Sequence, residues 1–210
     1  MTLPDVHVMV DLEALGNEPH RGPLIAIGAV AFTMVDEKIT YPITEDFEVA
    51  VRNGKFYYPI GLENQYEHYG FVIDVDTLEW WLKDKERLGQ LNEFIVSKYI
   101  VTLREAFEKF EWWVQTMCND QKRLMLWSHG ATYDCVHLAT KWPIVLKQSF
   151  NRVCPFRQMR DTRTLFALYE KSFGKSSYPD VLRQRHHHPL EDAWMQACAV
   201  QTAWKGLLRE

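Results

Sequence analysis

Four carboxylates and one histidine are the residues whose types and spacing could perform chemistry in this sequence. Asp11 and Glu13 stand two residues apart in an extended apolar segment, so their side chains point to the same side of the chain. Asp134 follows a short apolar segment, and Asp192 comes five residues after His187. Hard divalent cations such as Mg²⁺ and Mn²⁺ require carboxylate oxygens. This set could therefore hold two such ions.

Two metal ions and a histidine suit phosphodiester hydrolysis. Metal ions about 3.5–4 Å apart stabilise both the attacking and the leaving oxygen of a phosphodiester displacement. A histidine beside them, with an ordinary pKa of about 6.5, deprotonates an attacking water near neutral pH. We expect His187 to be this base, with its neighbour His188 as the alternative. The run 186–188 is internal and has no cysteine cluster, which excludes a tag and disfavours zinc.

The strands that position these residues follow from the apolar pattern. Valine alternates with other residues over 6–10 ahead of Asp11 and predicts a strand, and the apolar run 24–32 predicts a second. We place a third strand within 46–51. The segment 52–73 is aromatic and glycine-rich without a clear period, and we interpret it as an irregular insertion or a flexible loop.

Two helices are expected in the middle of the chain. Asp76 or Thr77 can cap a helix over 78–84, with an acidic first turn that suits the helix dipole. Thr102 and Glu105 form a capping box, and apolar residues follow them at helical spacing.

Strands and helices alternate in the second half of the chain. A strand over 123–128 precedes a helix from about Tyr133, and a strand near 153–159 leads into a helix over 161–170. A last helix begins near Pro189. Strands first, then helices alternating with strands, predict an α/β domain with a mixed sheet flanked by helices.

Composition excludes several classes of protein. The chain of 210 residues is 47% hydrophobic and 25% charged, which is ordinary globular usage and predicts a single domain over 1–210. Apolar runs are too short for a membrane helix, and the N-terminus lacks the layout of a signal peptide. The four cysteines form no C-x-x-C pair, so we expect neither a disulfide framework nor a zinc knuckle. A cytoplasmic protein without membrane contact is expected.

The net charge of −4 hides a strong asymmetry. Residues 1–140 carry 12 Lys+Arg against 22 Asp+Glu, whereas residues 141–185 carry 10 against 3. Local potential rather than net charge attracts an anionic polymer. The basic segment is therefore a candidate phosphate-binding face, and a solvated surface with carboxylates nearby is the alternative.

The acidic positions lie in motifs that resemble a known family. The strings 10-VDLEA-14, 128-SHGATYD-134 and 187-HHPLEDA-193 are similar to the three motifs of the DEDD superfamily of 3′→5′ exonucleases, in its His-bearing, DnaQ-like branch. The order of the motifs fits an RNase H-like fold over essentially the whole chain. The strings 77-TLEWW-81 and 160-RDTRTL-165 are similar to a smaller group, phage exonuclease A and related small bacterial exoribonucleases.

The resemblance implies roles for individual residues. It makes four residues metal ligands, namely Asp11, Glu13, Asp134 and Asp192. It makes His187 the general base, and it places Leu12 and Ala14 beside the terminal nucleotide. Ala14 stands where many relatives carry threonine, so a hydroxyl that could hold the 3′ end is missing. His129, a further candidate substrate contact, stands where the phage group usually has asparagine.

Two further substrate contacts are predicted from residue type. Adjacent Trp80 and Trp81 point about 100° apart on a helix, so one can face a cleft while the other packs in the core. A cleft-facing tryptophan could stack on an unpaired base, worth about 1–3 kcal/mol, and we assign this role to Trp81. Arg160 and Arg163 flank a helix cap, and we assign phosphate contact to Arg160, with a capping role as the alternative.

The sequence thus predicts a 3′→5′ exonuclease that depends on two Mg²⁺ or Mn²⁺ ions. Its expected substrate is the 3′ end of single-stranded nucleic acid, DNA or RNA, and its product is a nucleoside 5′-monophosphate. A catalytically silent nucleic-acid-binding module and a dinucleotide phosphodiesterase are the alternatives. Many relatives act as dimers, and the segment 52–73 is a candidate homodimer interface.

Overall fold

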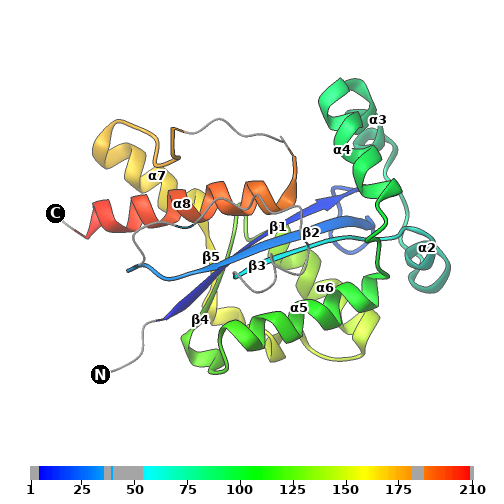
Figure 1. The fold of residues 1–210 in the computed structure, drawn as a ribbon, viewed down its shortest axis with the longest axis horizontal. Helices are drawn as coiled ribbons and strands as arrows, with labels where there is room; N and C mark the ends of the chain where they lie inside the picture. The colour runs from blue at the N-terminus through cyan, green and yellow to red at the C-terminus, as the bar shows by residue number, and fades with distance from the viewer. Residues whose placement is uncertain (1–4, 36–38, 40–53, 181–186, 209–210) are drawn as a thin grey trace.

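A five-stranded mixed sheet in the order β3-β2-β1-β4-β5 forms the centre of the molecule (Figure 1). The computed structural model describes residues 5–35, 39, 54–180 and 187–208. The strands are β1 (Val6–Ala14), β2 (Leu24–Phe32), β3 (Lys55–Pro59), β4 (Leu124–Ser128) and β5 (Met159–Asp161). β1 pairs antiparallel with β2 and parallel with β4, so β1 joins the antiparallel and parallel halves of the sheet.

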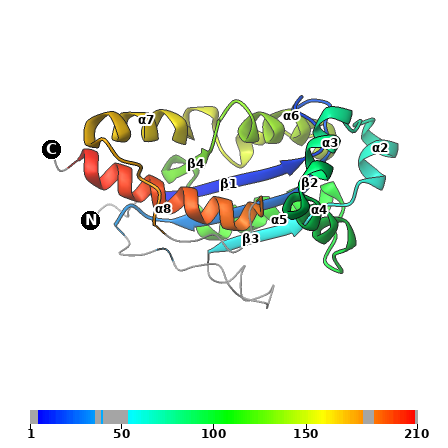
Figure 2. The same cartoon turned by 90° about the horizontal axis from the view of Figure 1, so that it is seen from above.

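Helices cover both faces of the sheet (Figures 1 and 2). They are α2 (Glu63–Tyr69), α3 (Val75–Lys83), α4 (Lys85–Val96), α5 (Leu103–Met117), α6 (Asp134–Leu146), α7 (Thr162–Phe173) and α8 (Pro189–Leu207). α5 and α6 pack on one face, and α7 and α8 pack on the other. α3 and α4 stand at the end of the sheet where β1 finishes. No described helix is long and apolar enough to cross a membrane.

The alternation of side chains along β1 divides the interior into two cores. Val8 and Val10 point toward α5 and α6 and are fully buried. Met9 points the other way, toward α8, and is also fully buried. Asp11 and Glu13 continue the Met9 side of the strand, so the alternation carries both carboxylates to the face that α8 covers.

Several local predictions are confirmed. The structure has strands over 6–14, 24–32 and 124–128, and the last helix begins at Pro189. The capping box at the start of α5 is present, with the Glu105 N–H donating to Thr102 Oγ1 over 3.2 Å.

The prediction of an irregular segment over 52–73 is wrong, because β3 and α2 lie within it. Phe56 of β3 packs against Phe110 and Trp113 of α5, with ring centroids 5.3 and 5.5 Å apart. These contacts come from a helix far along the chain, so no local period indicates the strand. The strand predicted within 46–51 lies outside the described residues.

Two other boundaries differ from the prediction. α3 begins earlier than expected, because Asp74 rather than Asp76 or Thr77 is its N-cap and accepts the Thr77 N–H over 2.8 Å. β5 begins at Met159, later than predicted, because short 3₁₀ turns occupy much of the stretch before it.

Candidate active site

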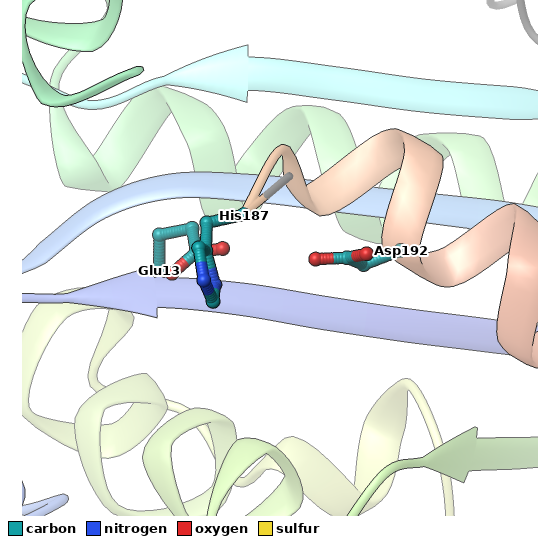
Figure 3. Close-up of side chains that lie close together, drawn as sticks. All are labelled: Glu13, His187 and Asp192. Carbon is teal, nitrogen blue, oxygen red and sulfur yellow. The ribbon is translucent and has the colours of Figure 1, made fainter. Parts of the chain in front are cut away.

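Three side chains from distant parts of the sequence meet beside the C-terminal end of β1 (Figure 3). Glu13 comes from β1, Asp192 from the first turn of α8, and His187 from the residue pair ahead of that helix. Each offers one ligand atom, and these atoms lie within 4.8 Å of one another. Among the described residues, these three side chains form the group whose spacing could hold a metal ion.

α8 also holds the other carboxylate of β1. Gln196 Nε2 donates a hydrogen bond of 2.9 Å to Asp11 Oδ1. Gln196 lies four residues after Asp192, so the two side chains share one face of the helix. Gln196 was not among the predicted site residues, although its four-residue spacing from a predicted metal ligand is a signal in the sequence.

The fourth carboxylate reaches β1 from the opposite helical layer. Asp134 is the first residue of α6, and its Oδ1 accepts the Leu12 N–H at 3.3 Å. Asp134 therefore flanks the cluster of Glu13, Asp192 and His187 rather than belonging to its tightest part.

The neighbouring carboxylates raise the proton affinity of Glu13. Burial, followed by the negative charges of Asp11, Asp192 and Asp134, raises the pKa of Glu13 well above its usual range. Burial also raises the pKa of Asp134 to about 8, against the opposing effect of the Leu12 N–H. Four carboxylates this close together need protons or cations to balance their negative charge. The oxygen donors and their charge fit hard divalent cations.

A glycine on β2 permits the close approach of α8. Gly28 pairs with Asp11 across the β1–β2 ladder. A Cβ atom at Gly28 would lie 2.3 Å from the Leu190 nitrogen and from the Pro189 carbonyl carbon, far inside contact distance. The missing side chain lets the first turn of α8 rest directly on the sheet beside Asp11. Gly28 was not predicted as a site residue, because its neighbours in α8 lie near the other end of the chain.

The two adjacent histidines face different surroundings. His187 has φ 56° and belongs to the cluster with Glu13, and its ring lies 5.0 Å from that of Trp80. His188 is the N-cap of α8 and is only 1% exposed. Its Nε2 lies 3.9 Å from Glu93 Oε1 of α4. This arrangement supports His187 rather than His188 as the residue that faces the reacting groups.

A pocket of about 370 Å³ opens beside Glu13. It is lined by Leu12, Glu13, Ala14, Asn17, Asp76, Thr77, Trp80, Trp81 and Tyr133. Three residues predicted to contact substrate, Leu12, Ala14 and Trp81, are in this lining. The pocket therefore joins the carboxylate of Glu13 to three of the residues predicted to contact substrate.

The tryptophan pair is divided between core and pocket. Trp81 is 1% exposed, and its Nε1 donates to the Ala14 carbonyl over 3.2 Å. Trp80 is 40% exposed, and the guanidinium of Arg87 lies over its ring at 4.0 Å. The assignment of base stacking to Trp81 is therefore corrected: Trp81 fixes the end of β1, and Trp80 is the indole that a substrate can reach.

His129 and Arg160 do not line the pocket beside Glu13. His129 Nδ1 lies 2.9 Å from Thr162 Oγ1, which attaches the loop after β4 to the start of α7. The Arg160 guanidinium donates to the Arg157 carbonyl over 2.6 Å and faces a separate pocket near the start of β1. For Arg160 the structure corrects the prediction of substrate contact, because its guanidinium bonds the backbone carbonyls of Arg157 and Met159 and is turned away from the pocket beside Glu13.

α6 holds the loop that follows β1. Tyr133 donates its hydroxyl hydrogen to the Gly16 carbonyl over 3.2 Å, and Lys141 Nζ donates to the Pro19 carbonyl. Lys141 is fully buried, and burial lowers its pKa to about 8. These bonds fix the wall of the pocket next to Glu13 on the same helix that supplies Asp134.

Comparison with known proteins gives a family and a fold. A family model described as the Rv2179c-like 3′-5′ exoribonuclease domain matches residues 6–204. No match is found among curated proteins.

Solved nuclease structures share the architecture. Cell-death related nuclease 4 (CRN-4) is 13% identical with a TM-score of 0.54, over 97% of this chain and 64% of that one. Exonuclease I from Methylocaldum szegediense is 11% identical with a TM-score of 0.55, over 96% and 41%. The zinc-bound E. coli ExoI–ssDNA complex is 9% identical with a TM-score of 0.54, over 99% and 43%. The chain thus spans 41–64% of these structures' lengths, and the likeness confirms the RNase H-like mixed sheet flanked by helices.

Proposed function

The chain belongs to the family of Rv2179c-like 3′-5′ exoribonuclease domains, and from that premise we propose that it removes nucleotides one at a time from the 3′ end of single-stranded RNA. The product is a nucleoside 5′-monophosphate. The observation that carries the proposal is the meeting of Glu13, His187 and Asp192 at the end of β1, with two further carboxylates beside them. The family description favours RNA over DNA as the physiological substrate.

Two divalent cations, Mg²⁺ or Mn²⁺, are part of the proposal. Asp11, Glu13, Asp134 and Asp192 would hold them, and the raised pKa of Glu13 is the property expected of carboxylates that await cations. Bound cations would neutralise the charge that develops on the oxygens of the scissile phosphate and would lower the pKa of the attacking water.

His187 serves as the general base in this proposal. Its imidazole accepts a proton from the water whose oxygen forms the new bond to phosphorus, while the bond between phosphorus and the 3′ oxygen breaks. The departing 3′ oxygen takes up a proton and becomes the new 3′ hydroxyl. Trp80 and Trp81 meet the His187 ring edge-on at 5.0 and 6.2 Å, which restricts the orientation of the imidazole.

The pocket beside Glu13 receives the terminal nucleotide. Leu12 and Ala14 form its apolar floor, and the exposed indole of Trp80 offers a surface on which the base can stack. A 3′ terminus must be unpaired to enter such a pocket, which favours single strands over duplexes.

Paired digestion of RNA and DNA tests the proposal. Matched 20-residue strands with a 5′ label are incubated with the protein in Mn²⁺ and, separately, in EDTA. We expect a ladder that shortens from the 3′ end, faster for RNA and absent in EDTA. Fragments from internal cleavage, or digestion that persists in EDTA, would overturn the proposal.

We also propose a reducing compartment, such as the cytoplasm, as the place of action. All four cysteines are free, and three of them are buried. Burial raises the pKa of Cys154 to about 12, which keeps this thiol protonated and unreactive.

A further inference from the structure

The basic residues of the segment 141–185 are distributed over several parts of the fold. Lys141 is buried beneath the loop after β1. Arg152 lies 3.7 Å from the carboxylate of Glu111 on α5. Arg160 bonds the backbone carbonyls of Arg157 and Met159. These three cations therefore have structural partners and do not form a common surface.

α7 carries a different set of cations, and these are exposed. Arg163 lies in its first turn and Lys171 near its end, eight residues later and about 80° further around the helix, with the exposed Ala167 between them. Lys175 follows directly after the C-cap, Gly174, and is also exposed. The exposed surface of α7 also carries one acidic residue, Glu170, next to Lys171. We call Arg163, Lys171 and Lys175 the α7 basic stripe.

The first member of the α7 basic stripe lies beside the active site. Gly130 precedes Asp134 in the loop after β4 and has φ 98°. The Arg163 guanidinium carbon lies 3.2 Å from where a Cβ of Gly130 would be, so the glycine makes room for it. The positive charge of Arg163 opposes the rise in the pKa of Asp134. No side-chain hydrogen bond or ion pair of Arg163 is found among the described residues, so its donors can bind a ligand.

The stripe leads away from the active site along the helix. β1, β4 and β5 are parallel, so all three point toward the edge of the sheet where Glu13 lies. α7 starts where β5 ends and runs back from that edge (Figure 2). At 1.5 Å per residue, Lys171 lies about 12 Å further along the axis than Arg163.

We propose that the α7 basic stripe binds the phosphates of the RNA strand upstream of the 3′ end. Arg163 contacts the phosphate nearest the cleaved bond, because a guanidinium forms two parallel bonds to phosphate oxygens. Lys171 and Lys175 act as point charges for phosphates further along the strand. The inference rests on the proposed function, since it assigns the path of the polymer that the site would shorten.

The test compares long and short substrates in two variants of identical charge. Lys171→Glu/Lys175→Glu reverses the end of the stripe, and the control Lys98→Glu/Lys109→Glu reverses two exposed lysines elsewhere. The measured quantity is the ratio of kcat/KM for a 20-residue RNA to that for a dinucleotide. We expect this ratio to fall about tenfold in the stripe variant and to stay within twofold of the wild type in the control. The slope of log affinity against log salt should decrease by about 0.7 for each phosphate that the variant no longer neutralises.

A binding measurement separates this inference from the proposed function. The same two variants are made in an Asp192→Asn background, and their affinity for labelled RNA is measured by fluorescence anisotropy. An equal decrease of affinity in the stripe and control variants, or no decrease in either, overturns the α7 path whether or not the enzyme turns over. A wild-type protein that hydrolyses neither substrate overturns the proposed function instead. Arg163→Ala should lower kcat/KM for both substrates, with partial recovery in Arg163→Lys.

Discussion

At the scale of single residues, the two neighbouring histidines should respond differently to replacement. His187 lies with Glu13 and Asp192, so His187→Ala removes the proposed base and should lower kcat by about 10²–10⁴-fold. His188 is buried next to Glu93, so His188→Ala should lower the melting temperature while keeping most of the turnover. Rates of RNA digestion and thermal unfolding measure the two effects. A reversed pattern of rates would move the general base to His188.

The raised pKa of Asp134 makes the free energy of unfolding of the metal-free protein depend on pH. Burial raises the pKa of Asp134 from 3.8 to about 8, so the native state keeps a proton that the unfolded chain has already released in this interval. The free energy of unfolding in EDTA should therefore decrease as pH rises from about 4 to 8. Melting temperatures at pH 5 and pH 8 measure this. The decrease should be smaller in Asp134→Asn, and equal decreases in both proteins would count against a raised pKa at Asp134.

The residue types predicted the carboxylates of the site, but they did not predict which tryptophan of the adjacent pair is buried. Asp11 and Glu13 in an apolar strand, followed by Asp134 and Asp192 in motifs of matching order, made the carboxylates conspicuous in the sequence. Trp80 and Trp81 are identical in type and adjacent, and only the three-dimensional contacts decide which one is buried. Their different environments explain why the sequence assigned the stacking role to the wrong member of the pair.

At the scale of secondary-structure elements, the contact of α8 with β2 sets the geometry of the site. Gly28→Ala would place a Cβ 2.3 Å from backbone atoms of Pro189 and Leu190, so the helix must shift away from the sheet. We expect kcat to fall at least tenfold, together with a decrease of several degrees in melting temperature, because Asp192 moves with the helix. Gly89→Ala on α4 is the control, since a Cβ there meets nothing within 4 Å. A Gly28→Ala protein with the wild-type rate would show that this close approach does not position Asp192.

Elements with local signals were predictable, and elements defined by distant contacts were not. The capping box of Thr102 and Glu105 and the aspartate at the start of α7 are interactions within a few residues, and both are present in the structure. β3 depends instead on packing of Phe56 against α5, and its short sequence lacks a clear period of its own. The phage exonuclease A group stays a prediction, because the match is to the wider family.

At the scale of the whole molecule, a divalent cation should stabilise the fold. A ligand that binds only the native state at 100 times its Kd adds about 2.7 kcal/mol to the free energy of unfolding. For a chain of this size that corresponds to a rise of about 5–11 °C in melting temperature. We expect Mn²⁺ to produce such a rise in the wild type and a much smaller one in Glu13→Gln. Equal rises in the two proteins would place the bound ion elsewhere.

The charges of the chain are distributed unevenly over the fold. The net charge of −4 adds the acidic cluster of the site to cations elsewhere in the fold, so the total says little about affinity for RNA. A homodimer remains a prediction of the sequence, as does the interface at 52–73, and sedimentation in solution would measure it.

The rate at which Asp192→Asn releases nucleoside 5′-monophosphate from RNA tests the central claim most directly. The substitution keeps the size and most of the hydrogen bonding of the side chain but removes one negative charge from the cluster with Glu13 and His187. With Mn²⁺ present, we predict a rate at least 10³-fold below that of the wild type, and an affinity for RNA that changes by less than threefold. A rate within tenfold of the wild type would contradict a cation-dependent nuclease site at the end of β1.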